Sequence, residues 1–271
     1  MLEKTLVFIF GSIVGSFLNV CIYRMPLEQS VVAPRSFCPH CKKMIPWFDN
    51  IPFISYILLG GRCRSCKERI SPRYFIVELI TAGTFLLFYN LFGISFAFFY
   101  YVIFVSGLII ATFIDIAHRI IPDEISVGGL VVGLLLNAFR GLELSPLYYD
   151  WHPVWGSFLG ILVGGGVIYL SGFIFDIVYF KLLKKPAIQG ETESMGGGDV
   201  KLLAMIGAFL GWQMALIGLV LGCCVGAVIG TINFVVKKDH TIPFGPFLAI
   251  GALIALFWAD KIVNYIFMLQ Q

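Results

Sequence analysis

Residues 94–114 read ISFAFFYYVIFVSGLIIATFI, and no side chain among them carries a charge. A helix needs about 20 mostly apolar residues to cross the hydrocarbon core of a bilayer. This stretch is long enough, and the carboxylate of Asp115 follows it directly. The segment therefore predicts a transmembrane helix that ends beside an acid.

The rest of the chain has the same apolar character. Of its 271 residues, 59% are hydrophobic and 13% are charged, and the mean hydropathy is +0.90. A soluble domain carries about 25% charged residues and is less than half apolar. The composition therefore indicates an integral membrane protein. The net charge of +3 is too small to indicate a nucleic-acid partner.

Several apolar segments are candidate spans. The first could be mistaken for a signal peptide, but no small-residue cleavage site precedes the polar segment that follows, so we interpret it as a retained span. The fourth and sixth candidates are short. Together they predict an all-α polytopic membrane protein with about eight transmembrane helices, near residues 5–23, 75–92, 94–114, 125–139, 153–180, 200–212, 213–236 and 246–269.

The distribution of lysine and arginine predicts the orientation of these helices, because cytoplasmic loops carry an excess of both. If the segment 24–74 is cytoplasmic, eight spans place both termini outside. All but three of the 19 lysines and arginines then fall on the cytoplasmic side, the exceptions being Lys4, Arg140 and Lys261.

Two CxxC pairs lie in the polar segment, Cys38–Cys41 and Cys63–Cys66, with 21 residues between them. Four thiolates in two such pairs suit a tetrahedral Zn²⁺ ion. Two disulfides or a redox pair are the alternatives, but a cytoplasmic loop disfavours disulfides and a redox pair needs no copy. The pattern predicts a structural zinc site at Cys38, Cys41, Cys63 and Cys66, with no open position for catalysis.

Acids at the edges of spans are the second chemical signal, because carboxylates there are costly and usually functional. The alternation of spans places Asp115 and Asp199 at one depth on the same face. Two close carboxylates share a proton, so that together they can activate a water against an amide. The expected organisation is a first transmembrane helix at 1–23, a cytoplasmic zinc-knuckle loop domain at 24–74, and a helical membrane domain at 75–271 carrying this aspartyl protease pair.

Helix capping is the alternative role for such acids. Asp123 follows Pro122 and precedes the fourth candidate span, so we interpret it as an N-cap. The same role is open to Asp199. The three glycines at 196–198 favour function instead, because a cap does not need them and they permit close backbone approach to the acid. No role is predicted for Asp176.

Taken together, the motifs resemble those of the bacterial type IV prepilin peptidases, which belong to the GxGD aspartyl proteases. The resemblance implies that Asp115 and Asp199 are the catalytic pair, supported by Gly196, Gly198 and Lys201 of the GxGD loop. It also implies that the four cysteines are the family's cysteine motif. The matching pieces run in order along nearly the whole chain: GSFLNVCIYRMP (15–26), CPHCKKMIPWFDNIPFISYILLGGRCRSCKERISPRYFIVEL (38–79), FIDIAHRIIPDEIS (113–126), GGGDVKLLAMIGAFLG (196–211) and IPFGPFLA (242–249).

The resemblance further implies a bifunctional enzyme of the bacterial cell inner membrane, with its active site on the cytoplasmic side. Such enzymes remove the basic leader of type IV prepilins or pseudopilins after a glycine, in type IV pilus and type II secretion systems. They then N-methylate the new first residue with S-adenosylmethionine. The expected partners are these substrates and membrane lipid, with no nucleic acid, and the expected cofactors are structural Zn²⁺ and S-adenosylmethionine.

Glu78 is our candidate for the methyl-transfer step. It lies at the membrane edge directly after the cysteine loop, where a carboxylate could bind the freed α-amine and help to take its proton. The alternative is an ion pair with Arg73 or Arg69.

Three other classes of protein compete with this interpretation. A proton-coupled transporter would need paired repeats and has no use for a zinc loop. A zinc-dependent membrane protease would need an open metal site and an HExxH-like pair. A non-enzymatic scaffold would use the zinc loop for docking, and assaying cleavage of a leader-bearing pilin with and without chelator separates all three. The histidines do not form the HExxH-like pair that a zinc-dependent protease would need; they lie at His40, His118, His152 and His240.

Overall fold

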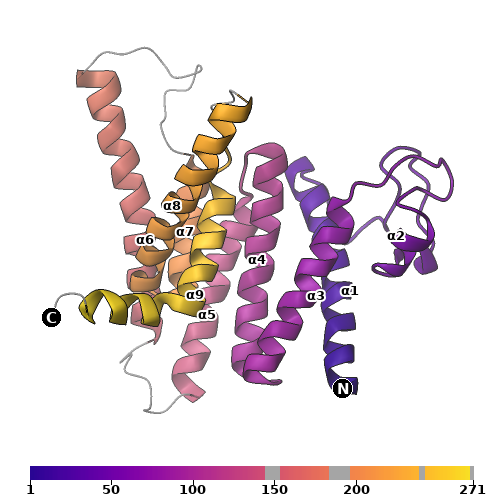
Figure 1. Ribbon diagram of the computed structural model, residues 1–271, viewed down its shortest axis with the longest axis horizontal. Helices are drawn as coiled ribbons and strands as arrows, with labels where there is room; N and C mark the ends of the chain where they lie inside the picture. The colour runs from indigo at the N-terminus through magenta and orange to yellow at the C-terminus, as the bar shows by residue number, and fades with distance from the viewer. Residues whose placement is uncertain (144–152, 183–195, 238–241, 269–271) are drawn as a thin grey trace. The chain divides into compact units, whose positions relative to one another are not determined.

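The computed structural model describes residues 1–143, 153–182, 196–237 and 242–268, so His152 and His240 lie outside the described residues. Within these ranges the chain is helical and no β-strand forms (Figure 1). The elements are α1 (Leu2–Arg24), η1 (Met25–Leu27), η2 (Trp47–Asn50), α2 (Ile54–Leu58), α3 (Arg73–Phe92), α4 (Phe96–His118), α5 (Asp123–Glu143), α6 (Pro153–Asp176), η3 (Ile177–Leu182), α7 (Gly197–Leu210), α8 (Trp212–Lys237) and α9 (Gly245–Met268).

The all-helical membrane fold expected from the sequence is confirmed. Five helices in the described part of the chain are long and apolar enough to cross a membrane. The helix α7 has 14 residues, so it is about 21 Å long, whereas the hydrocarbon core is about 30 Å thick. The total of eight spans therefore stays a prediction. The five spans are Leu2–Leu27, Arg73–Phe92, Phe96–His118, Pro153–Tyr179 and Trp212–Asn233.

The chain divides into two compact units, Met1–Ile114 and Asp115–Gln271. In the first unit α1 packs along α3 through two glycines. A Cβ atom on Gly11 would lie 2.8 Å from Cβ of Phe85, and one on Gly15 would lie 2.7 Å from Cα of Glu78. Small residues allow helix backbones to approach this closely in a membrane. The contact at Gly15 fixes Glu78 against α1.

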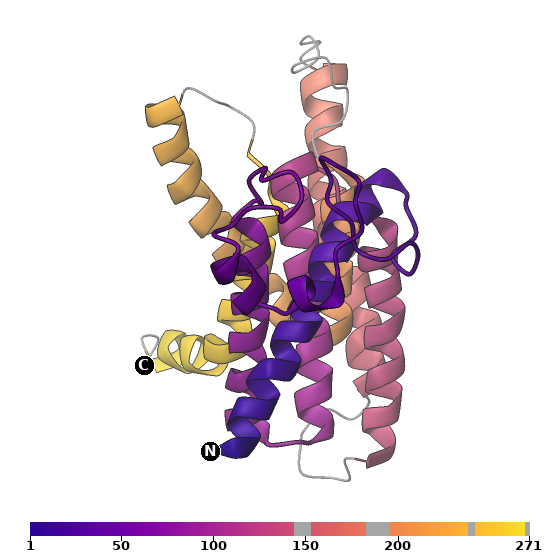
Figure 2. The same cartoon turned by 90° about the vertical axis from the view of Figure 1, so that its right-hand side faces the viewer.

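The predicted zinc-knuckle loop lies between α1 and α3. It forms a lobe of turns and short helices at the C-terminal end of α1 and the N-terminal end of α3 (Figures 1 and 2). Isolated bridges join Phe37 to Met44 and Arg62 to Arg69, one around each CxxC pair.

In the second unit the short helix α7 packs against α5, α6, α8 and α9 (Figure 1). Its contact with α6 is close because Gly207 meets Gly160 backbone to backbone. Asn137 of α5 and Ser157 of α6 both donate hydrogen bonds to the carbonyl oxygen of Ala208. Gly211, with φ 82°, then turns the chain from α7 into α8. These contacts hold the C-terminal part of α7, the helix that carries Asp199 in its first turn.

Candidate active site and metal centre

Asp115 lies in the last turn of α4 and is 5% exposed. The helix ends at His118, because Arg119 adopts a left-handed conformation (φ 57°) while its N–H still bonds the carbonyl oxygen of Asp115. Pro122 follows, where a helix cannot continue. The carboxylate is therefore held at a sharp change in chain direction.

The N-terminus of α9 provides the hydrogen-bond donor to this carboxylate. The backbone N–H of Gly245 donates to Oδ2 of Asp115 at 2.8 Å. A Cβ atom on Gly245 would lie 2.7 Å from the same oxygen and 3.3 Å from Cδ1 of Ile121. Only glycine fits there without displacing a neighbour. Sequence reasoning missed this contact, although Gly245 lies in IPFGPFLA (242–249), one of the pieces that resemble the family.

Asp199 lies in the first turn of α7, where its N–H bonds the carbonyl oxygen of Gly196. Gly196 is the N-cap of that helix, so the capping alternative for Asp199 is wrong. Burial and, to a smaller extent, the negative charge of Asp115 together raise the pKa of Asp199 to about 7. The structure thus brings the two predicted acids within electrostatic reach of each other in the second unit.

The three glycines before Asp199 differ in their surroundings. A Cβ atom on Gly198 would lie 3.1 Å from Cβ of Ile121, whereas one on Gly197 would meet nothing within 4 Å. The nearest atom to a Cβ on Gly196 is Oδ2 of Asp199, at an ordinary contact distance of 3.7 Å. The close approach expected at this motif occurs at Gly198, and the neighbour is the turn after α4. Approach of a substrate to Asp199 stays a prediction.

Lys201 lies beside this site, and it is paired. Its Nζ atom is 2.6 Å from Oδ1 of Asp123, and both side chains are largely exposed. Asp123 is the first helical residue of α5, so its interpretation as an N-cap is wrong. An exposed pair of this kind contributes about 0–1 kcal/mol. It joins the first turns of α5 and α7. Asp176 ends α6 and has no assigned role.

The four cysteines of the loop come together in the first unit. Their Sγ atoms all lie within 4.8 Å of one another, and the distance between the Cys38 and Cys66 sulfurs is 3.8 Å. A tetrahedral zinc site with Zn–S bonds of about 2.3 Å has S···S edges of about 3.8 Å. All four are free thiols, which excludes the disulfide alternative within the structure. The donor set therefore fits Zn²⁺.

Each cysteine pair lies in its own turn, and the two turns have the same backbone geometry. Lys42 N–H bonds the carbonyl oxygen of Cys38, and Lys67 N–H bonds that of Cys63, at 2.9 and 3.0 Å. Both lysines are left-handed, with φ 58° and 60°. Such matching turns aim each pair of thiols at a common centre.

Glu78 is buried in the first unit, away from this cluster of thiols. Its Oε2 atom accepts a hydrogen bond of 3.1 Å from the N–H of Phe53, and the Ser16 side chain is a second hydrogen-bonding neighbour. Within the described residues it forms no ion pair. Arg73 instead lies over the ring of Tyr74, with 5.4 Å between CZ and the ring centroid. The ion-pair alternative for Glu78 is therefore absent from the structure.

Comparisons with known proteins identify the family of the chain. Residues 9–92 match the bacterial peptidase A24 N-terminal domain, and residues 102–231, which contain both acids, match the type IV leader peptidase family. The chain is similar to prepilin leader peptidase/N-methyltransferases of Legionella pneumophila (34% identity; 95% of this chain and 92% of the relative), Stutzerimonas stutzeri (35%; 94% and 90%) and Pseudomonas aeruginosa (36%; 94% and 90%). No solved structure matches the chain.

Proposed function

Because the chain belongs to the type IV leader peptidase family, we propose that it removes the basic leader from type IV prepilins or pseudopilins and then methylates the new N-terminus. The relatives' names join the same two activities. The observation that carries the peptidase assignment is the electrostatic coupling of Asp115 and Asp199 in one site.

The surroundings of the two acids support a division of labour. The N–H of Gly245, at the positive end of α9, stabilises the ionised form of Asp115. Burial and the charge of Asp115 keep the proton on Asp199 near neutral pH. Asp115 would then take a proton from the attacking water while Asp199 gives its proton to the scissile carbonyl oxygen. The proton on Asp115 would pass to the leaving amine when the intermediate collapses.

The position of both acids at helix ends supports cleavage at the membrane surface. Asp115 lies in the last turn of a span, and Asp199 lies in the first turn of a helix too short to cross the bilayer. A prepilin consists of a basic leader and an apolar helix, so its scissile glycine bond lies at the same level. The excess of lysine and arginine in the 24–74 segment supports the cytoplasmic side of the bacterial inner membrane. Eight spans with both termini outside satisfy that orientation.

For methylation, we assign the binding of the freed α-amine to Glu78. A buried carboxylate that accepts only a peptide N–H and a hydroxyl can take an ammonium ion and then its proton. S-adenosylmethionine would supply the methyl group. Cys38, Cys41, Cys63 and Cys66 would hold Zn²⁺, which would join the two halves of the loop and take no part in peptide cleavage. The substrates would belong to type IV pilus or type II secretion systems.

The proposal is tested on the full chain purified in detergent. The chain is incubated with a leader-bearing pilin and S-adenosylmethionine, and the products are identified by mass spectrometry. We expect a mature pilin that has lost its leader and gained one methyl group. Accumulation of intact prepilin with folded, zinc-loaded enzyme would contradict the proposal.

A further inference from the structure

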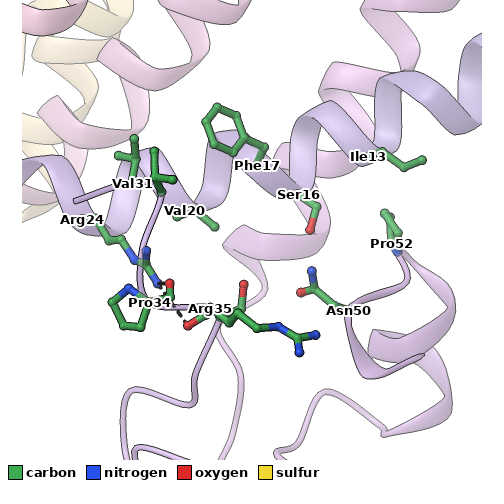
Figure 3. A pocket seen from close by; sticks show the side chains of 12 residues that line it. Ile13, Ser16, Phe17, Val20, Arg24, Val31, Pro34, Arg35, Asn50 and Pro52 are labelled. Carbon is green, nitrogen blue, oxygen red and sulfur yellow. Dashed lines mark hydrogen bonds between the residues drawn. The ribbon is translucent and has the colours of Figure 1, made fainter. Parts of the chain in front are cut away.

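A cavity of about 460 Å³ lies in the first unit, between α1 and the loop that follows it (Figure 3). Its volume lies within the range of about 300–1,000 Å³ that is usual for small-molecule sites. The wall from the membrane helix is mostly apolar and has Arg24 at its C-terminal end, whereas the loop contributes both polar and apolar side chains. The lining residues are Ile13, Ser16, Phe17, Val20, Arg24, Val31, Val32, Pro34, Arg35, Ser36, Asn50 and Pro52.

The lining is positively charged, since it contains two arginines and no acid. The Arg24 side chain is 3% exposed and donates to the carbonyl oxygens of Ser30 at 2.9 Å and Pro34 at 2.7 Å. These oxygens satisfy its N–H groups but carry no net charge to balance it. A buried charge is costly unless a counter-charge lies nearby. The cavity therefore favours an anion.

The second arginine, Arg35, is exposed and lines the cavity from the loop. Figure 3 shows the side chains of Arg35 and Asn50 pointing toward one another. A guanidinium fork and an amide in this arrangement supply several donors to one phosphate group.

The apolar wall continues along α1. Leu6, Phe10, Ile13 and Phe17 are each between 51% and 56% exposed and lie on one face of the helix. Ile13 and Phe17 also line the cavity, so this apolar stripe leads directly into it. The stripe extends about 17 Å along α1, which lies in a candidate membrane span. An acyl chain fits a surface of that length and character.

We propose that this cavity binds an anionic phospholipid, with its phosphate between Arg35 and Asn50 and one acyl chain along the stripe of α1. The positive charge of the lining disfavours two other ligands, both of which are cationic. A basic leader peptide would be repelled by Arg24 and Arg35, and S-adenosylmethionine would bring a sulfonium cation to the same arginines. The site is separate from the acid pair and goes beyond the function proposed above.

The test uses native mass spectrometry of the full chain in detergent, titrated with phosphatidylglycerol or with phosphatidylcholine. We expect tighter binding of phosphatidylglycerol. Arg35→Gln should weaken that binding about fivefold, because one arginine near an anionic surface contributes about 1 kcal/mol. Arg69→Gln is the matched control: it makes the same charge change on an exposed residue of the same loop that does not line the cavity. Zinc content and melting temperature verify that each variant is folded.

The apolar wall is tested separately. Phe17→Ala should weaken the binding of both lipids while leaving the preference for phosphatidylglycerol intact. Soluble glycerol phosphate should compete poorly, since it lacks an acyl chain. Equal binding of the two lipids, an equal loss in Arg69→Gln, full competition by glycerol phosphate, or displacement of the lipid by S-adenosylmethionine would each overturn the proposal.

Discussion

The backbone N–H of Gly245 donates a 2.8 Å hydrogen bond to Oδ2 of Asp115, across 130 positions of the sequence. The first residue of α9 thereby contacts the last turn of α4. The same glycine leaves no room for a side chain. The acid pair therefore depends on a third element that contributes only backbone.

Gly245→Ala should reduce peptide cleavage at least tenfold, because its Cβ atom would lie 2.7 Å from Oδ2 of Asp115 and push the carboxylate aside. A displacement of about 1 Å in an active site can cost about a hundredfold in rate. Initial rates of leader removal measure the effect. Gly197→Ala is the control, since Gly197 also begins a helix but has open space around it. Equal rates for the two variants would show that the contact at Gly245 is unimportant.

Asp115→Asn and Asp199→Asn should each lower cleavage at least a hundredfold while membrane insertion is preserved, because one acid must accept a proton and the other must donate one. Asp123→Asn should keep most of the activity, since it weakens only an exposed pair with Lys201. Leader removal is followed on gels together with the yield of folded protein. An inactive Asp123→Asn beside an active Asp115→Asn would identify a different partner for Asp199.

Asp199→Asn should also stabilise the protein, and more so as the pH rises. The pKa of Asp199 is about 7 in the folded chain but about 3.9 when unfolded. Between these values the unfolded chain binds fewer protons, so the wild type loses stability with rising pH, whereas the Asn variant has no such proton to lose. The difference in melting temperature should grow from about pH 4 to about pH 7. A melting-temperature difference that does not change with pH, or an equal difference in Asp123→Asn, would contradict the raised pKa of Asp199.

Carefully reduced protein should contain one Zn²⁺ per chain, bound by Cys38, Cys41, Cys63 and Cys66. Cys38→Ser should lose the metal and loosen both knuckles, because metal binding and local folding are coupled. Methylation should fall more than cleavage, since the acids that cleave lie in the other unit. Metal analysis and proteolysis of the loop measure these effects. Less than half an equivalent of zinc in the wild type would refute the site.

Glu78→Gln should abolish methylation and preserve cleavage. The amide oxygen of glutamine can still accept the N–H of Phe53, so the packing against α1 is kept while the negative charge is lost. Mass spectrometry of the mature pilin separates the two steps. Normal methylation in this variant would remove Glu78 from the mechanism, and equal loss of both activities would indicate a folding role.

Features that the sequence predicts well have local signals. An uncharged stretch such as 94–114 predicts a span by itself, and two CxxC pairs predict a cluster of thiols because each pair forms its own turn. Alternation of spans predicted Asp115 and Asp199 at one depth on the same face, and in the structure the charge of Asp115 acts on Asp199. The contact from Gly245 has no such signal, because a backbone N–H is present at every residue but proline.

The same limit explains the misassigned cap at Asp123. The capping interpretation at Asp123 rests on its position after Pro122, but the carboxylate turns to Lys201, which is 78 positions away. Similarly, the glycines before Asp199 indicate that another group approaches closely, but they do not identify it. In the structure, Ile121 is the residue that lies close to Gly198. Partners that are distant in sequence depend on helix packing, which local patterns do not specify.

The hydrogen bond from Gly245 also sets an order of events during biosynthesis. The ribosome makes Asp115 first, Asp199 later, and the donor of α9 only afterwards, 130 positions after the acid that it contacts. A nascent chain that stops before residue 245 holds both carboxylates but lacks the N–H that donates a hydrogen bond to one of them. We therefore expect the protease to become competent only after α9 has docked against Asp115.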